Sequence, residues 1–137
     1  MQNPVIQTME MNQSGGGLTW KRLMSLLEHH HKDILKRESA GTDGFIYLYD
    51  AGEYWVAFEQ SACLLRQLFP DCDIIVLHLQ AWPFPVVMAS VQDSLFRKYS
   101  RTHIVRAFGP DHKILSGSPV SPEQYSRWHK AALDGLI

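Results

Sequence analysis

The sequence predicts one small α/β domain of the α+β kind, in which helices flank a small mixed β-sheet. Segments with apolar residues every three or four positions alternate with short runs rich in β-branched and aromatic residues. The 137 residues are 45% hydrophobic and 20% charged, close to the average of globular domains. Residues 1–17 are polar and end in SGGG, which predicts a flexible N-terminal arm before a single domain over 18–137.

The first expected element is a helix that begins near Leu18 and ends before the segment ESAGTDG at 38–44. Thr19 is its expected N-cap, because a threonine oxygen can accept a hydrogen bond from a free N–H of the first turn. Apolar positions three and four apart form one face for packing. These positions are Trp20, Leu23, Leu27 and Ile34, with Met24 and Leu35 beside them.

Residues 45–49 and 54–58 predict the two strands of a β-hairpin. Both runs are rich in aromatic and branched residues, and they flank the turn sequence Asp-Ala-Gly-Glu. Gly52 is expected to take a positive φ in that turn. A short helix follows, and Pro70 ends it. Its apolar face consists of Ala62, Leu65, Leu68 and Phe69.

The second half of the chain predicts three more strands and two more helices. The run 73–79 is apolar on both faces, which is typical of a buried central strand. Ser121 and Pro122 suit a cap and a first helical position, and they predict a helix at 121–137 that closes the domain. The other expected elements are a strand at 86–89, a helix at 91–99, a strand at 102–108 and a turn at 109–111.

Composition and motifs leave few classes of function. The net charge of -1 gives no overall field that attracts a polyanion. No apolar run is long enough to span a membrane and no signal peptide is found, so we expect a cytoplasmic protein without a membrane partner. The absence of a phosphate-binding glycine loop predicts no nucleotide, and no other cofactor is indicated. Cys63 and Cys72 lack the spacing of a zinc site or disulfide framework and are expected to be buried or unreactive free thiols.

No catalytic or metal site is predicted, so we expect the chain not to be an enzyme. Adjacent histidines at 29–31 point about 100° apart on a helix and cannot share a metal ion, which favours a solvated helix end. His78 is expected to be a hydrogen-bonded core histidine in the buried strand. Asp71 and Asp73 favour a capped loop over a pair of acid–base carboxylates.

A basic stretch at 97–106 is the strongest candidate for a binding surface. Its cations could contact the phosphates of a nucleic acid. A solvated helix end that leads into an edge strand explains the same charges without a ligand, and both explanations stay open. The stretch contains Arg97, Lys98, Arg101 and Arg106, with Tyr99 and His103 between them.

Five segments follow one another in an order that a known family shares. They are the helix beginning LTWKRL, the hairpin FIYLYDAGEYWVAF, the helix EQSACLLRQLF, the strand CDIIVLHL and the segment PVVMASVQDSLFRKY. Over about residues 18–108 this series resembles the N-terminal domain of MutS-type DNA mismatch-repair proteins. The hairpin is similar to the family's stretch RMGDFYELF-DDA. The matching positions are Gly52, Glu53, Tyr54, Trp55, Phe58 and Ala62, and Met88-Ala89-Ser90-Val91 echoes the family's MAGVPYHA.

The resemblance implies a recognition domain without catalysis. The family reads a mismatch with a Phe-x-Glu motif, in which the ring wedges beside a base and the carboxylate hydrogen-bonds to that base. Tyr54 and Val56 occupy these two positions. Tyr54 keeps a ring that can stack, whereas Val56 accepts no hydrogen bond. Strand alternation places Tyr54 and Trp55 on opposite faces, so we expect one of them to be buried.

Two functions stay open for a domain that, without a Walker loop, is expected to be free-standing. In the first, DNA is the partner, and Tyr54 stacks on a base with Trp55 and Val56 beside it. The phosphates are then contacted by Arg97, Lys98, Arg101 and Arg106. In the second, the chain is a protein-interaction or regulatory module that has kept the fold but not DNA contact, and Tyr54 and Trp55 are packing or interface anchors.

Overall fold

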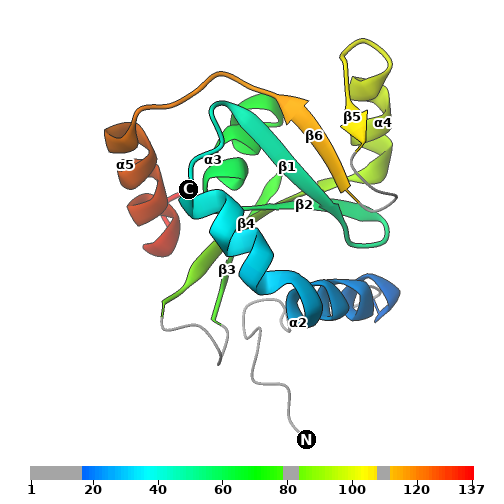
Figure 1. The fold of residues 1–137 in the computed structure, drawn as a ribbon, viewed down its shortest axis with the longest axis horizontal. Coiled ribbons are helices and arrows are strands. Elements are labelled where there is room, and N and C mark those ends of the chain that lie inside the picture. The colour runs from blue at the N-terminus through cyan, green and yellow to red at the C-terminus, as the bar shows by residue number, and fades with distance from the viewer. Residues whose placement is uncertain (1–16, 79–83, 108–111) are drawn as a thin grey trace, which may run out of the picture.

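The computed structural model describes residues 17–78, 84–107 and 112–137. They form three layers, in which one sheet lies between two layers of helix (Figure 1). Among the described helices, one covers one face of the sheet and three cover the other. The arm predicted at 1–17 lies outside the described residues except for Gly17. The elements are α2 (Gly17–Ser39), β1 (Phe45–Asp50), β2 (Tyr54–Phe58), α3 (Glu59–Leu68), β3 (Asp73–Leu77), β4 (Val86–Gln92), α4 (Asp93–Ser100), β5 (Arg106–Ala107), β6 (His112–Ser116) and α5 (Pro122–Leu133).

The six strands lie in the order β3-β4-β2-β1-β6-β5. The predicted α/β class is confirmed, but the prediction of a mixed sheet is wrong. Every pairing between the described strands is antiparallel. Strands that follow one another directly, such as β1 and β2, pair in this way because a short turn reverses the chain, whereas a parallel pair needs a long crossover.

Each face of the sheet has its own hydrophobic core. On one face, Leu23, Leu27 and Ile34 of α2 pack on the sheet together with Val56. On the other face, Trp55 belongs to a cluster that joins the sheet to α3, α4 and α5. Alternate residues of a strand point to opposite faces, so Tyr54 shares the α2 face with Val56. Trp55 therefore points away from both, as the alternation predicts.

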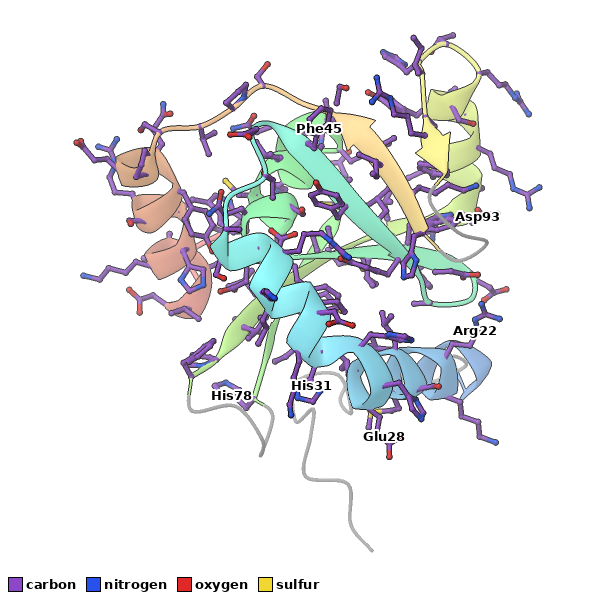
Figure 2. All side chains as sticks on the ribbon, viewed as in Figure 1. Arg22, Glu28, His31, Phe45, His78 and Asp93 are labelled. Carbon is purple, nitrogen blue, oxygen red and sulfur yellow. The ribbon has the colours of Figure 1, made fainter. Side chains whose placement is uncertain are left out.

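The β1–β2 hairpin confirms the predicted strands and turn. Gly52 has a φ of 92°, which an L side chain rarely adopts, and its N–H donates to Asp50 Oδ1 at 2.8 Å. The N–H of Ala51 donates to the carbonyl of Tyr54 at 2.9 Å and closes the turn. Arg22 of α2 reaches the same turn, where its guanidinium lies 2.6 Å from Asp50 Oδ2 (Figure 2).

The strand expected at the centre of the sheet lies at its edge. β3 covers Asp73–Leu77, Asp73 is exposed, and β4 is its strand neighbour in the sheet. Its apolar sequence has another cause: Ile74 packs in the cluster of one face and Ile75 in that of the other. An apolar run indicates that both faces of a strand are covered by other elements. It does not indicate that the strand has a neighbouring strand on each side.

Other boundaries differ from the predicted ones. α2 begins at Gly17, so Thr19 lies within the helix instead of capping it. β4 extends to Gln92, and the helix expected from 91 begins at Asp93. The strand expected at 102–108 is reduced to Arg106–Ala107, and the turn predicted at 109–111 lies outside the described residues. The sequence analysis did not predict β6, the strand between β1 and β5.

The closing helix α5 is confirmed with its N-terminal cap. Ser121 Oγ accepts a hydrogen bond from the N–H of Gln124 at 3.1 Å, and Gln124 Oε1 accepts one from the N–H of Ser121 at 2.9 Å. Pro122 occupies the first turn. The helix ends at Leu133, and Gly135 follows with a φ of 72°. Cys63 and Cys72 are buried free thiols, also as predicted.

Candidate nucleic-acid interface

Two of the seven predicted contact residues are buried. Trp55 is 8% exposed, its ring centre lies 5.2 Å from that of Phe96, and its indole N–H donates to Asp93 Oδ1 at 2.8 Å. Val56 is 2% exposed and belongs to the core under α2. The prediction that Trp55 and Val56 contact DNA is therefore wrong for this structure, because other residues of the domain cover both side chains.

Tyr54 is partly exposed and lies at one end of the sheet. It pairs with Gln92 at the end of β4, and Asp73 at the start of β3 pairs with Ser90 nearby. A depression of about 450 Å³, here called the Tyr54 hollow, opens at this end. It is lined by Tyr54, Leu68, Phe69, Pro70, Asp71, Cys72, Asp73, Ser90, Val91, Gln92 and Leu95.

The three cations of α4 and its C-terminal end are exposed. Leu95 lines the Tyr54 hollow, and Lys98 follows three positions later on a neighbouring part of the helix surface. Arg101 lies one further turn along. Arg97 forms an ion pair with Asp93, with Nε 2.7 Å from Oδ2. Lys98 and Arg101 are therefore the cations best placed to continue the surface of the hollow.

Arg106 does not lie on the same side as these cations. It pairs with Ile114 of β6, and the next residue, Leu115, belongs to the core under α3 and α4. Paired residues share a face and neighbours in a strand alternate, so Arg106 points to the α2 face. The sheet edge thus separates Arg106 from the exposed surface of α4, and the basic stretch is not one continuous patch.

Tyr99, between the predicted cations, has a structural role. Its ring packs 5.3 Å from that of Phe69, and the ring of His103 stacks on it at 3.9 Å. The ring nitrogen Nδ1 of His103 lies 3.1 Å from the carbonyl of Tyr99. These contacts join the segment after α4 to the helix.

The histidines occupy places other than those expected. Residues 29–31 lie in the middle of α2 instead of at its end, and the Nδ1 atoms of His29 and His31 donate to carbonyls one turn earlier. His78 is exposed and follows β3, so the prediction of a core histidine is wrong (Figure 2). Within the described ranges, no group of three His, Cys, Asp or Glu residues could hold a metal ion.

A second polar cluster, which the sequence analysis did not predict, lies where α2, α3 and α5 meet. The carboxylate of Glu38, in the last turn of α2, accepts hydrogen bonds from the N–H and the hydroxyl of Ser61 at 2.9 and 2.6 Å. Glu59 Oε1 accepts from the N–H of Val87 at 2.9 Å and from His129 Nε2 at 3.0 Å. Tyr125 of α5 lies against His129, with 5.4 Å between the ring centres.

The path of the backbone explains why Glu59 and Glu38 accept hydrogen bonds from backbone N–H groups. Phe58 pairs with Met88, and Glu59 then turns into α3 with a φ of 52°. The N–H of Val87 next to this turn receives a side-chain carboxylate in place of a backbone partner. Glu38 accepts a hydrogen bond from the N–H of Ser61 in the first turn of α3, where Phe58 provides no side-chain cap. It is 2% exposed, and burial raises the pKa of Glu38 from 4.5 to about 7 although the bonds from Ser61 lower it.

Comparisons of the chain with protein-family models, with curated proteins and with solved structures find no match. In the part of the chain that the structure describes, no helix is both long enough and apolar enough to cross a membrane. The Tyr54 hollow and the cations beside it are therefore the described features that bear on function.

Proposed function

We propose that this chain is a non-catalytic nucleic-acid-recognition domain that holds an unpaired base in the Tyr54 hollow. The observation that carries the proposal is the position of a partly exposed tyrosine ring in a depression of about 450 Å³ next to exposed cations of α4. Proteins that bind single strands combine an aromatic stacking surface with cations along the backbone. The resemblance of the hairpin to the mismatch-recognition domain supports the same use of Tyr54.

The lining of the hollow suits the two faces and the edge of a base. Leu68, Phe69 and Leu95 give it an apolar lining, and the ring of Tyr54 adds an aromatic surface on which a base can stack. Asp71 and Asp73 place carboxylates at the same depression. A carboxylate accepts hydrogen bonds from an exocyclic amino group, as acidic residues do from cytosine N4. The hollow therefore favours a base that carries an amino group.

The charge distribution favours a short contact with the backbone. The net charge is -1, so attraction of phosphate has to come from local cations. Lys98, three positions after Leu95, and Arg101, at the end of α4, supply it, and Arg97 contributes less because it is paired with Asp93. Two phosphates next to a base in the hollow are the expected footprint, and log K should fall with log salt with a slope of about -1.4.

Val56, at the position of the glutamate in the family's Phe-x-Glu motif, does not read the base in this proposal. Val56 carries no hydrogen-bonding group and is 2% exposed. A mismatch in a duplex would gain nothing from this position, whereas a base that is already unstacked can enter the hollow without that carboxylate. We therefore expect single-stranded DNA or RNA to bind more tightly than either a matched or a mismatched duplex.

The test is a binding titration by fluorescence anisotropy with single-stranded, matched and mismatched oligonucleotides over a series of salt concentrations. Lys98→Ala/Arg101→Ala should lower affinity for the single strand and reduce the slope of log K against log salt by about 1.4, the value for two lost phosphate contacts. Arg127→Ala/Lys130→Ala removes two exposed charges from α5 and should change neither. An absence of binding at low salt would exclude the proposed function.

The protein-interaction alternative is favoured by one observation. Two large apolar side chains near α4 are strongly exposed, Leu95 by 48% and Ile104 by 84%. Exposed apolar residues of this kind often anchor a protein partner. Under this alternative the hollow would receive an apolar side chain, no oligonucleotide would bind at low salt, and Leu95→Ser would abolish capture of a partner.

A further inference from the structure

A second hollow lies where α2, α3 and α5 meet. Some of the polar atoms in its lining make no hydrogen bond to another described residue. Its volume is about 350 Å³, within the range of small-molecule sites. Leu35, Phe84 and the ring of Tyr125 give it apolar walls, and Glu59 and Gln60 contribute polar groups. We call it the Glu59 hollow.

The Glu59 hollow contains three acceptor atoms that make no hydrogen bond to another described residue. Among the described residues, Glu59 Oε2, Gln60 Oε1 and Tyr125 Oη have no hydrogen-bond partner, whereas both partners of Glu59 bind its other oxygen. Two side chains at the hollow already donate to carbonyls. Gln60 Nε2 donates to the carbonyl of Glu38 at 3.3 Å, and Ser39 Oγ donates to that of Lys36 at 3.0 Å.

The charge around these acceptors is negative. Glu59 lies close enough to Glu38 to raise the pKa of that carboxyl further, after the larger effect of burial. Burial, followed by Glu59 and Glu38, raises the pKa of Tyr125, which keeps its hydroxyl neutral. The C-terminal end of α2 adds the negative end of a helix dipole. Lys36 lines the hollow as well, but its side chain is exposed, so its ammonium can extend into solvent.

We infer that the Glu59 hollow binds a primary alkylammonium group. An ammonium has three N–H donors and no acceptor, which matches Glu59 Oε2, Gln60 Oε1 and Tyr125 Oη. Its alkyl chain lies against Leu35 and Phe84. His129 is a positioning residue, because its bond to Oε1 holds Glu59 with Oε2 free. The group comes either from a free amine or from a lysine side chain of another protein.

The test is an NMR titration of the whole chain, in which the backbone amide signals of residues 59–61 are followed. The probes are n-butylammonium, Nα-acetyl-lysine methylamide and the neutral isostere 1-butanol. Both cations should shift these signals saturably, and the alcohol should not. Tighter binding of the lysine derivative assigns the site to a protein partner, and tighter binding of butylammonium assigns it to a free amine. Equal shifts with 1-butanol, or no saturable shift up to tens of millimolar cation, would overturn the inference.

Variants separate a binding role from a structural one. Glu59→Gln keeps an oxygen for Val87 and His129 but removes the charge, and it should weaken cation binding roughly 10- to 100-fold. Tyr125→Phe removes one acceptor of a partly exposed residue and should weaken binding roughly 3- to 10-fold even if Glu59→Gln fails to fold. Glu123→Gln, on the exposed side of α5, is the matched control and should bind like the wild type. Undiminished binding in Tyr125→Phe would contradict the proposed ligand set.

Discussion

The indole N–H of Trp55 donates to Asp93 Oδ1 at 2.8 Å, and this bond joins the β1–β2 hairpin to the first turn of α4. The N–H of Asp93 also donates to the carbonyl of Glu53 at 2.8 Å. Asp93 therefore lies at the hairpin turn with both its backbone and its side chain engaged (Figure 2). The aromatic next to Tyr54 is thus a structural residue, and it fixes α4 beside the hollow that Tyr54 lines.

Asp93→Ala should destabilise the domain by about 1–3 kcal/mol, because it leaves the buried indole N–H of Trp55 without an acceptor. Urea denaturation measures the loss as a lower midpoint with an unchanged slope. Asp33→Ala, at an exposed position of α2, is the control and should change the free energy of unfolding by no more than about 0.5 kcal/mol. Equal stability of the two variants would show that the Trp55–Asp93 bond contributes nothing.

Glu38 should make the domain less stable as pH rises. Its pKa is about 7 in the folded protein and 4.5 as an ordinary carboxyl. Below pH 4.5 both states hold the proton, and as pH rises towards 7 the unfolded state loses it first, so stability falls. Relative to Glu38→Gln, the wild type should lose on the order of 3 kcal/mol between about pH 4 and pH 8.

The measurement is the free energy of unfolding of wild type and Glu38→Gln over that pH range. Only the difference between the two proteins reports on Glu38, because other carboxyls titrate in both. Glu28→Gln changes an exposed carboxylate of the same helix and should follow the wild type at every pH (Figure 2). A constant difference between wild type and Glu38→Gln would mean that the pKa of Glu38 is the same in the folded and unfolded states, which would contradict the prediction.

Gly41 and Gly44 form a matched pair for the segment between α2 and β1. Both have a positive φ, 89° and 86°, so alanine at either position should cost roughly 1–2 kcal/mol in backbone strain. A Cβ at Gly44 would also lie 3.0 Å from Pro119 Cγ, whereas one at Gly41 would meet nothing within 4 Å. Thermal unfolding should therefore place Gly44→Ala below Gly41→Ala. The opposite order would contradict the close packing of the 117–119 segment on this turn.

The two thiols should react slowly in the folded protein. Burial raises the pKa of both Cys63 and Cys72 from 9.0 to about 11. Near pH 8 the thiolate fraction is then roughly 100-fold lower than in the unfolded chain, and alkylation by iodoacetamide should slow at least as much. Mass spectrometry of the native and the urea-unfolded protein measures this. Fast labelling of one cysteine in the native state would show that its surroundings open.

Local signals predicted the elements that depend on local chemistry. Gly52 marks the hairpin turn and Ser121-Pro122 marks the start of α5, because the backbone there needs those residue types. The order of strands has no such signal. The run at 73–77 is apolar in the same way at an edge as at a centre, and the insertion of β6 between β1 and β5 depends on contacts distant in sequence.

The candidate sites were predicted less well for the same reason. Alternation along β2 correctly separated Tyr54 from Trp55, but the resemblance could not show that both Trp55 and Val56 are covered. The cluster at the Glu59 hollow joins residues up to 70 positions apart. One signal was present: Glu38 lies one helical turn after Ile34 on the apolar face of α2, and a carboxylate on such a face usually has a buried partner.

The central claim is that Tyr54 stacks on a base, and the affinity of Tyr54 variants for a short single-stranded oligonucleotide at low salt tests it most directly. Tyr54→Phe keeps the ring and should bind within about twofold of the wild type, whereas Tyr54→Ala should bind roughly 5- to 150-fold more weakly. Urea denaturation should show that both variants remain folded. Tyr54→Ala that binds as tightly as the wild type would contradict the claim.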